Sequence, residues 1–186
     1  MNKLEEDKTF VIGYESKKIQ DKVFETLLSI GYLESDTLLD FGCGYGHLIN
    51  YMTENNISTK NYVGMDTNSL YIETCKKNYP RNQFVTGYSN EINHNFDYIF
   101  CASCLHTTTQ DVYQEIQILL ERCLKGIALS FNNTDIQSST SEKHTKFDAS
   151  EMFIYISQTY PSYQTRLIKN LLTSNDMFAI FIYKKH

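Results

Sequence analysis

A glycine-rich stretch in the first third of the chain constrains the fold more than any other feature. The run GCGYG, residues 42–46, directly follows the apolar segment Thr37–Phe41 and precedes a helix-like segment, residues 47–56. Because glycine lacks a Cβ atom, three of these five positions allow a tight turn and let backbone amides approach a ligand closely. The pattern predicts a strand, a tight loop and a helix, which together open an α/β sheet.

The same alternation of strand-like and helix-like segments continues along the chain. Further apolar, strand-like segments lie at residues 61–66, 83–87, 96–102 and 126–131, and helix-like segments at residues 69–79 and 111–124. Strands that alternate with helices indicate a parallel sheet covered on both faces. Near the end, YQTRLIKNLL and MFAIFIYKK flank a polar turn and predict an antiparallel hairpin. We therefore expect a doubly wound α/β fold: a seven-stranded sheet of five parallel strands plus a C-terminal antiparallel hairpin, with helices on both faces.

The connection between the third and fourth strands is too short for the usual crossover helix. Only about eight residues, Tyr88 to Asn95, separate these strands, whereas a helical crossover takes a dozen or more. Extended chain at ~3.3 Å per residue can still cross the sheet edge. We expect this one helix to be missing.

The length of 186 residues suits one domain with a sizeable core. We expect a single domain, with residues 1–34 as a leading helical segment and residues 35–186 as the Rossmann-like core. Within the leading segment, residues 16–30 form an amphipathic helix, and residues 148–159 form another helix late in the chain.

Charge and composition restrict the partners. The net charge is −5 and the lysines are scattered, which argues against DNA and makes an RNA partner unlikely on charge grounds. No segment approaches the ~20 continuous apolar residues of a membrane span, and acids stand where a signal peptide has its apolar core. We expect a cytoplasmic protein, no membrane partner, and five cysteines present as thiols.

Two acidic residues near the glycine loop indicate which ligand it binds. Asp66 ends the second strand about twenty residues after the loop, the spacing at which a carboxylate accepts hydrogen bonds from a ribose diol. Asp40 stands two residues before Gly42, where it would repel a pyrophosphate. The glycines also run GxGxG rather than the GxGxxG of dinucleotide sites. An acid here suits the cationic methionine moiety of S-adenosylmethionine.

These motifs resemble those of the class I S-adenosylmethionine-dependent methyltransferases. LLDFGCGYGHL is similar to their first motif and YVGMD to their second. The flanking segments IGYESKKIQDKVFETLLSIGYL and FAIFIYKK resemble a branch of small bacterial methyltransferases that has no inserted lid and no assigned substrate. The resemblance covers nearly the whole chain and implies that S-adenosylmethionine is the cofactor.

The resemblance also implies roles for individual residues. The three glycines wrap the methionine end, Asp40 supports it, Asp66 binds the ribose, and two residues border the adenine. In such enzymes the loop after the third strand commonly supplies an acid near the adenine amino group. Here Tyr88 departs from that pattern, so a stacked ring or a backbone contact meets the adenine edge instead. The expected cofactor-binding residues are Asp40, Gly42, Gly44, Gly46, Asp66, Thr67, Asn68, Tyr88, Ser89, Cys101 and Tyr14.

The segment CASCLH, residues 101–106, follows the fourth strand, where open parallel sheets place reactive groups. His106 could take a proton from the methyl acceptor or could pack and bond to backbone, and in-line alignment can work without a base. Cys101 and Cys104 could form a redox or zinc pair, but zinc would need a second pair that the sequence lacks. We therefore expect apolar thiols and no metal.

The sequence predicts methyl transfer from S-adenosylmethionine to an O, N or S nucleophile of a small molecule. Nothing resembles the Asn/Asp-Pro-Pro-aromatic motif of enzymes that methylate amino groups in DNA. Three alternatives stay open: non-methyl chemistry on the same cofactor, a non-catalytic methyltransferase-like binding module, and an RNA methyltransferase.

Overall fold

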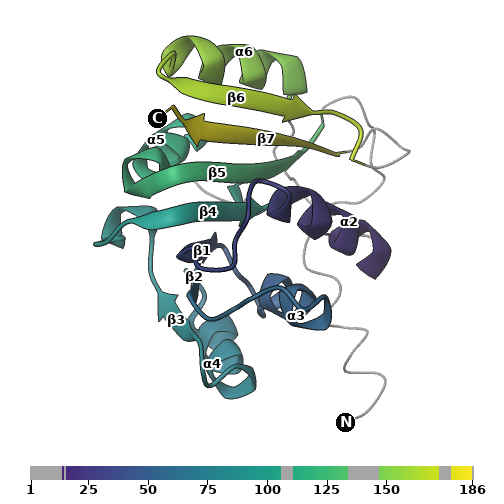
Figure 1. Ribbon diagram of the computed structural model, residues 1–186, viewed down its shortest axis with the longest axis vertical. Coiled ribbons are helices and arrows are strands. Elements are labelled where there is room, and N and C mark those ends of the chain that lie inside the picture. The colour runs from purple at the N-terminus through teal and green to yellow at the C-terminus, as the bar shows by residue number, and fades with distance from the viewer. Residues whose placement is uncertain (1–13, 15, 106–110, 134–146, 172–176, 186) are drawn as a thin grey trace.

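The structure is a computed structural model that describes residues 14, 16–105, 111–133, 147–171 and 177–185. Seven strands form one sheet in the order β3-β2-β1-β4-β5-β7-β6 (Figure 1). Strands β1 to β5 run parallel, and β7 lies antiparallel between β5 and β6. The strands are β1 Leu38–Phe41, β2 Tyr62–Asp66, β3 Gln83–Thr86, β4 Phe96–Ala102, β5 Cys123–Asn132, β6 Tyr163–Ile168 and β7 Met177–Lys184. The predicted sheet, five parallel strands plus an antiparallel C-terminal hairpin, is confirmed.

Helices cover both faces of this sheet, as predicted. The helical elements are α2 Lys17–Leu28, α3 His47–Glu54, α4 Ser69–Asn78, η1 Ser89–Glu91, α5 Val112–Arg122 and α6 Ala149–Thr159. Apolar residues of α2, α3 and α4 form one core cluster with one face of the sheet, and those of α5 and α6 form a second cluster with the other face. Figure 1 shows α2 lying across β4 and β5.

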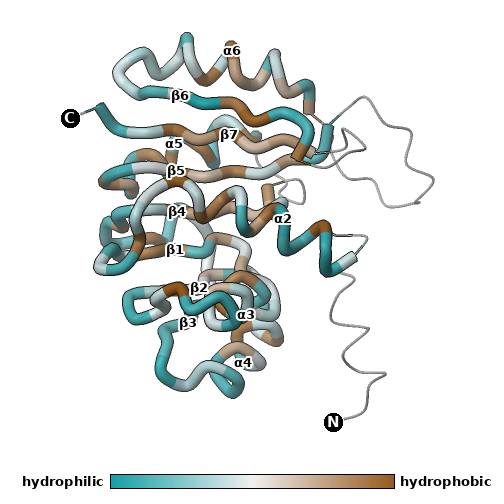
Figure 2. The backbone as a smooth tube through the Cα atoms, turned by 45° about the vertical axis from the view of Figure 1, so that its right-hand side comes forward, coloured by the Kyte–Doolittle hydropathy of each residue, from teal (hydrophilic) through white to brown (hydrophobic). Residues whose placement is uncertain are grey.

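Side-chain alternation along each strand divides residues between these two clusters. Leu38 and Phe100 belong to the α2 side, whereas Leu39 and Cys101 belong to the α5 side. This is the two-residue period of a strand buried on both faces. In Figure 2 hydrophobic residues follow β5 and β7, and β7 is buried from Met177 to Ile182. The central strands thus need apolar residues at nearly every position.

The connection between β3 and β4 contains only the short 3₁₀ turn η1. The backbone amide of Tyr88, the residue before this turn, donates to the carboxylate of Glu91 at 2.7 Å, which closes the turn. The prediction that a crossover helix is missing here is confirmed.

Several element boundaries differ from the sequence prediction, and two of them are informative. Helix α5 ends at Arg122 rather than Leu124, because Cys123 already has extended backbone angles and pairs with Phe96 of β4. Strand β6 ends at Ile168, and Asn170 beyond it has a left-handed φ of 57°. The expected turn at residues 173–176 lies outside the described residues.

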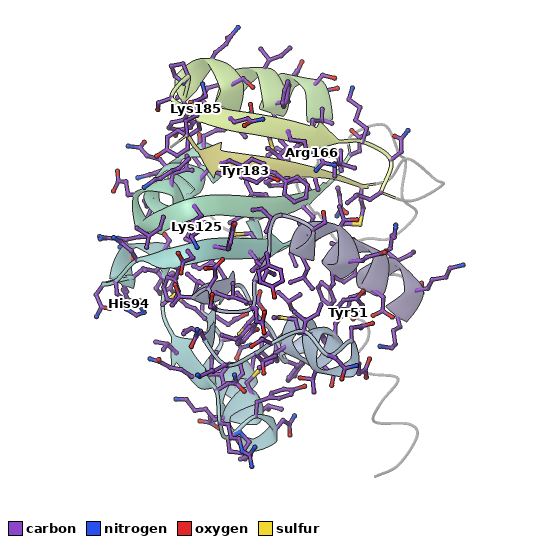
Figure 3. All side chains as sticks on the ribbon, viewed as in Figure 1. Tyr51, His94, Lys125, Arg166, Tyr183 and Lys185 are labelled. Carbon is purple, nitrogen blue, oxygen red and sulfur yellow. The ribbon has the colours of Figure 1, made fainter. Side chains whose placement is uncertain are left out.

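An ion-pair cluster holds together the end of the sheet at which the parallel strands begin. The ammonium group of Lys125 pairs with Asp36 and, at 3.3 Å, with Asp97. Asp97 also accepts hydrogen bonds from the amide and hydroxyl groups of Thr37 at 2.9 Å. Figure 3 shows Lys125 and His94 toward this same end. These contacts leave the opposite end, where β1, β2 and β4 finish, for ligand binding.

In the part of the chain that the structure describes, no helix combines the length and the apolar character needed to cross a membrane.

Candidate cofactor site

The glycine loop connects β1 to α3 and has left-handed backbone angles at all three glycines. At Gly42, φ is 77°, and a Cβ atom would lie 2.2 Å from the Cβ of Cys104, so both backbone and packing require glycine. At Gly44, φ is 52° and a Cβ atom would meet nothing within 4 Å. Gly42 is therefore packed against the end of β4, whereas Gly44 faces open space that a ligand can occupy.

Hydrogen bonds tie this loop to the end of β2. The amides of Gly42 and Cys43 donate to the carbonyl oxygen of Met65 at 2.7 and 3.0 Å. The amide of Gly44 donates to Oδ2 of Asp66, and the amide of Asn68 to Oδ1, both at 2.9 Å. A carboxylate has about four lone-pair sites, so each oxygen of Asp66 can accept one more hydrogen bond. A vicinal diol supplies two such donors.

The residues after Asp66 begin helix α4. Thr67 is exposed beside Asp66. The side-chain carbonyl of Asn68 accepts a 3.0 Å hydrogen bond from the amide of Leu70 and so caps the helix. Thr67 and Asn68, the predicted adenine neighbours, thus lie next to Asp66. The side chain of Asn68 also stabilises the start of helix α4.

Asp40 lies beneath the glycine loop and is only 2% exposed. The hydroxyl group of Tyr62 donates a hydrogen bond to its Oδ2. Burial raises the pKa of Asp40 to about 7, the bond from Tyr62 opposes this rise, and the charge of Asp66 adds to it. Asp40 is therefore a buried acid that changes charge near neutral pH, directly under the loop.

The turn after β3 also lies at the end of the sheet where β1 and β2 finish. The amide of Gly87 donates to the backbone oxygen of Asp66 at 3.1 Å, which places this turn beside the β2 end. The ring of Tyr88 is 57% exposed. Ser89 is buried, and its hydroxyl oxygen has no hydrogen-bond partner among the described residues. A flat ring and an unpaired hydroxyl next to Asp66 fit the edge of a nucleobase.

The end of β4 brings a second set of polar groups against the glycine loop. The thiol of Cys104 donates to the backbone oxygen of Phe41 at 2.9 Å. Ser103, with a left-handed φ of 57°, accepts a 3.2 Å hydrogen bond from the hydroxyl of Tyr14. The ring of Tyr14 packs edge-on against Phe24 of α2 at 6.2 Å. The residue before the leading helix thus reaches the end of β4.

The structure brings most of the predicted residues together, but not Cys101. The three glycines, Asp40, Asp66 and Tyr14 gather where β1, β2 and β4 end. The side chain of Cys101 is buried in the cluster under α5, on the opposite face of the sheet from Asp40, and burial raises the pKa of its thiol. His106 lies outside the described residues, and no group of three metal-ligating side chains occurs within them.

Sequence reasoning missed three residues that shape the site. Tyr62 binds Asp40, Cys75 donates from its thiol to the backbone oxygen of Gly44 at 3.3 Å, and Ser130 lies 3.2 Å from the hydroxyl of Ser103. Tyr62 and Cys75 lie in apolar patterns that predict only core packing. Of the three, only Ser130 stands out in the sequence, because it is a hydroxyl residue inside the apolar run GIALSF.

A match to a known sequence family covers this part of the chain. Residues 38–127 match the family described as "Methyltransferase domain". The range begins at β1 and includes the glycine loop, Asp66 and the turn after β3. No curated protein matches the chain.

Solved structures share the fold over most of the chain. The plantazolicin methyltransferase BpumL, in complex with a triazolic desmethylPZN analog and SAH, gives a TM-score of 0.72 at 14% identity, over 92% of this chain and 87% of that one. The magnesium protoporphyrin IX methyltransferase ChlM from Synechocystis PCC 6803, with bound SAM, gives 0.68 at 14% identity, over 90% and 79%.

A third neighbour, a SAM dependent methyltransferase from Aquifex aeolicus, gives a TM-score of 0.73 at 14% identity, over 96% of this chain and 98% of that one. At such low identity these likenesses establish the shared fold. Residues 38–127 thus match a methyltransferase domain, and the described fold is the one found in S-adenosylmethionine-dependent methyltransferases.

Proposed function

We propose that this chain transfers the methyl group of S-adenosylmethionine to a nucleophilic atom of a small molecule. The observation that carries the proposal is the position of the Asp66 carboxylate. It is held by the amides of Gly44 and Asn68, it has lone pairs to spare, and it lies beside the open space at Gly44. This arrangement fits a ribose diol next to a closely approached backbone loop.

The remaining residues fit the other parts of the cofactor. The buried acid Asp40 provides negative charge under the loop, which suits a cationic methionine moiety. Tyr88 and Ser89 offer an exposed ring and an unpaired hydroxyl for the adenine. Tyr14 reaches over from the leading segment toward the end of β4. When bound, the cofactor supplies an electrophilic methyl group on a sulfonium.

The protein itself contributes alignment. Residues of the loop and of the β4 end fix the positions of the two reactants, and in-line displacement gains most of its rate from such positioning. His106 follows the β4 end in the sequence and stays our candidate for a general base, where the acceptor has a proton to lose.

Two observations favour a small molecule as the methyl acceptor. The net charge of −5 does not suit a polyanionic partner. Two of the structural neighbours are named for the methylation of plantazolicin and of magnesium protoporphyrin IX. An RNA acceptor is less favoured on the same grounds.

Calorimetric titration of S-adenosylhomocysteine tests the cofactor site without knowledge of the acceptor. We expect micromolar binding to the intact protein and at least a ~10-fold loss in Asp66→Ala, which removes the diol acceptor. Asp148→Ala is a matched control, because Asp148 also accepts two backbone amide hydrogen bonds but lies at the start of α6. No binding to the intact protein would contradict the proposal.

Product analysis separates methyl transfer from other uses of the same cofactor. In a screen of small molecules with S-adenosylmethionine, we expect S-adenosylhomocysteine as the coproduct. Release of 5′-methylthioadenosine instead would show attack on the aminobutyryl carbon and would overturn methyl transfer.

A further inference from the structure

Three hydroxyl groups from distant parts of the chain meet at the end of β4. Tyr14 Oη lies 3.2 Å from Ser103 Oγ, and Ser103 Oγ lies 3.2 Å from Ser130 Oγ. Tyr14 precedes α2, Ser103 follows β4, and Ser130 lies in β5. We call these three residues the hydroxyl cluster. The proposed function uses Tyr14 for the cofactor and leaves Ser103 and Ser130 without a function.

A count of donors and acceptors favours one arrangement of the hydrogen atoms in the cluster. Tyr14 is the donor to Ser103. Ser130 is only 1% exposed and lies within hydrogen-bonding distance of Ser103. Either serine can be the donor in this pair. A buried hydroxyl that keeps its proton unpaired is costly, which favours Ser130, the more buried of the two, as the donor. Both lone pairs of the Ser103 oxygen are then occupied, and its own O–H remains as the one donor to spare.

The cluster also holds its protons firmly. Burial raises the pKa of Tyr14 well above its usual value, so the phenol stays protonated in the neutral range. Serine hydroxyls do not ionise there either. The three groups can therefore donate hydrogen bonds but cannot remove a proton from a substrate.

Ser103 lies beside the proposed cofactor site. The next residue, Cys104, packs directly against Gly42 of the cofactor loop. The φ of Ser103 is 57°, a left-handed angle that is uncommon for residues other than glycine and that occurs often at functional sites. The spare O–H thus belongs to a constrained residue beside the cofactor loop.

We propose that Ser103 determines acceptor specificity, by donating its hydrogen bond to one oxygen of a small carboxylate that is methylated on the other oxygen. A carboxylate fits because it arrives already deprotonated, and a donor pairs strongly with an anionic oxygen. Its free oxygen forms the new O–C bond, the C–S bond of the sulfonium breaks, and the electron pair stays on sulfur. The products are a methyl ester and neutral S-adenosylhomocysteine, and no proton is transferred.

This inference rests on the proposed function, and the two can fail separately. The probes are benzoate, phenol, aniline and thiophenol, with octanoate and octylamine as aliphatic counterparts, each supplied with S-adenosylmethionine. We expect methyl esters from the carboxylates. Methylation of nitrogen or sulfur probes alone, or no ester from either carboxylate while S-adenosylhomocysteine still binds, overturns the inference. Loss of S-adenosylhomocysteine binding in the intact protein contradicts the proposed function itself.

The decisive variant is Ser103→Gly, because glycine keeps the left-handed backbone without strain and removes only the hydroxymethyl group. We expect the KM for the carboxylate to rise ~10-fold, the value for one lost hydrogen bond to a charged group, with the affinity for S-adenosylhomocysteine unchanged. Ser157→Ala is the matched control, because Ser157 also pairs with a hydroxyl, that of Thr165 at 2.7 Å, but lies in α6. An unchanged KM in Ser103→Gly would show that the hydroxyl is structural.

Discussion

The backbone amide of Gly44 donates a 2.9 Å hydrogen bond to the carboxylate of Asp66. This contact joins the loop after β1 to the end of β2 and acts together with the bond from the Asn68 amide on the other carboxylate oxygen. The acid is therefore fixed in place before any ligand arrives. A site that is ordered in advance loses less conformational entropy on binding, which increases affinity.

Replacing Asp66 with asparagine tests this relationship more finely than truncation. An asparagine has nearly the same shape, but one of its terminal atoms is an NH₂ group that would meet the N–H of Gly44 or Asn68. We expect Asp66→Asn to weaken S-adenosylhomocysteine binding by about 10-fold or more while the protein stays folded. Calorimetry and a thermal melt measure the two effects. Affinity equal to that of the unaltered protein would show that Asp66 does not contact the ligand.

We expect alanine substitutions at Gly42 and Gly44 to affect stability and cofactor affinity differently. Gly42→Ala places a Cβ atom 2.2 Å from the Cβ of Cys104 at a φ of 77°, so we expect a loss of about 3 kcal/mol in the free energy of unfolding. Gly44→Ala meets nothing within 4 Å, so we expect about 1 kcal/mol but a large loss of cofactor affinity.

Urea denaturation and calorimetry on the two variants separate these expectations. If Gly44→Ala binds S-adenosylhomocysteine as well as the unaltered protein, the open space at Gly44 is not part of the ligand site. If Gly42→Ala is as stable as Gly44→Ala, packing against Cys104 is not a reason for glycine at position 42.

The sequence predicts the sheet well because its signals are local. Apolar strands, the glycine loop and the short 88–95 connection each lie within one segment, and the spacing of Asp40 and Asp66 follows from the order of the strands. The burial of Cys101 on the α5 side follows from alternation, since its neighbour Phe100 packs on the α2 side.

The hydrogen bonds that position side chains in the site join residues far apart in the sequence, so the sequence does not reveal them. Tyr62 and Asp40 are 22 residues apart, and Tyr14 and Ser103 are 89 apart. No periodicity links such pairs. An aromatic residue at the start of a buried strand predicts packing, and only the folded chain shows that its hydroxyl reaches a carboxylate.

Asp40 should make stability depend on pH in an unusual direction. Its pKa is about 7 in the folded protein, above the ordinary value of 3.8, so the folded state binds a proton more tightly than the unfolded state. The stability from the protonated form is fully present below about pH 4 and is lost as pH rises toward 7. We expect Asp40→Asn to remove a decrease of a few kcal/mol between about pH 4 and pH 7.

Chemical denaturation at several pH values measures this effect. The comparison of Asp40→Asn with the unaltered protein isolates Asp40 from the other acids, whose contributions are common to both. The same slope in both proteins would mean that Asp40 keeps an ordinary pKa.

The charge of Asp40 should also distinguish S-adenosylmethionine from its product. The two ligands share every group except the methylated sulfur, which is a cation only in S-adenosylmethionine. Because a nearby cation favours the carboxylate form, binding of S-adenosylmethionine should lower the pKa of Asp40 and release a proton near pH 7. We expect the affinity for S-adenosylmethionine, relative to S-adenosylhomocysteine, to rise ~3- to 10-fold between pH 6 and 8.

Calorimetry in buffers of different ionisation enthalpy measures the released proton directly. Asp40→Asn should bind both ligands with a ratio that does not change with pH, and a pH-independent ratio in the unaltered protein would show that the buried acid does not act on the sulfonium.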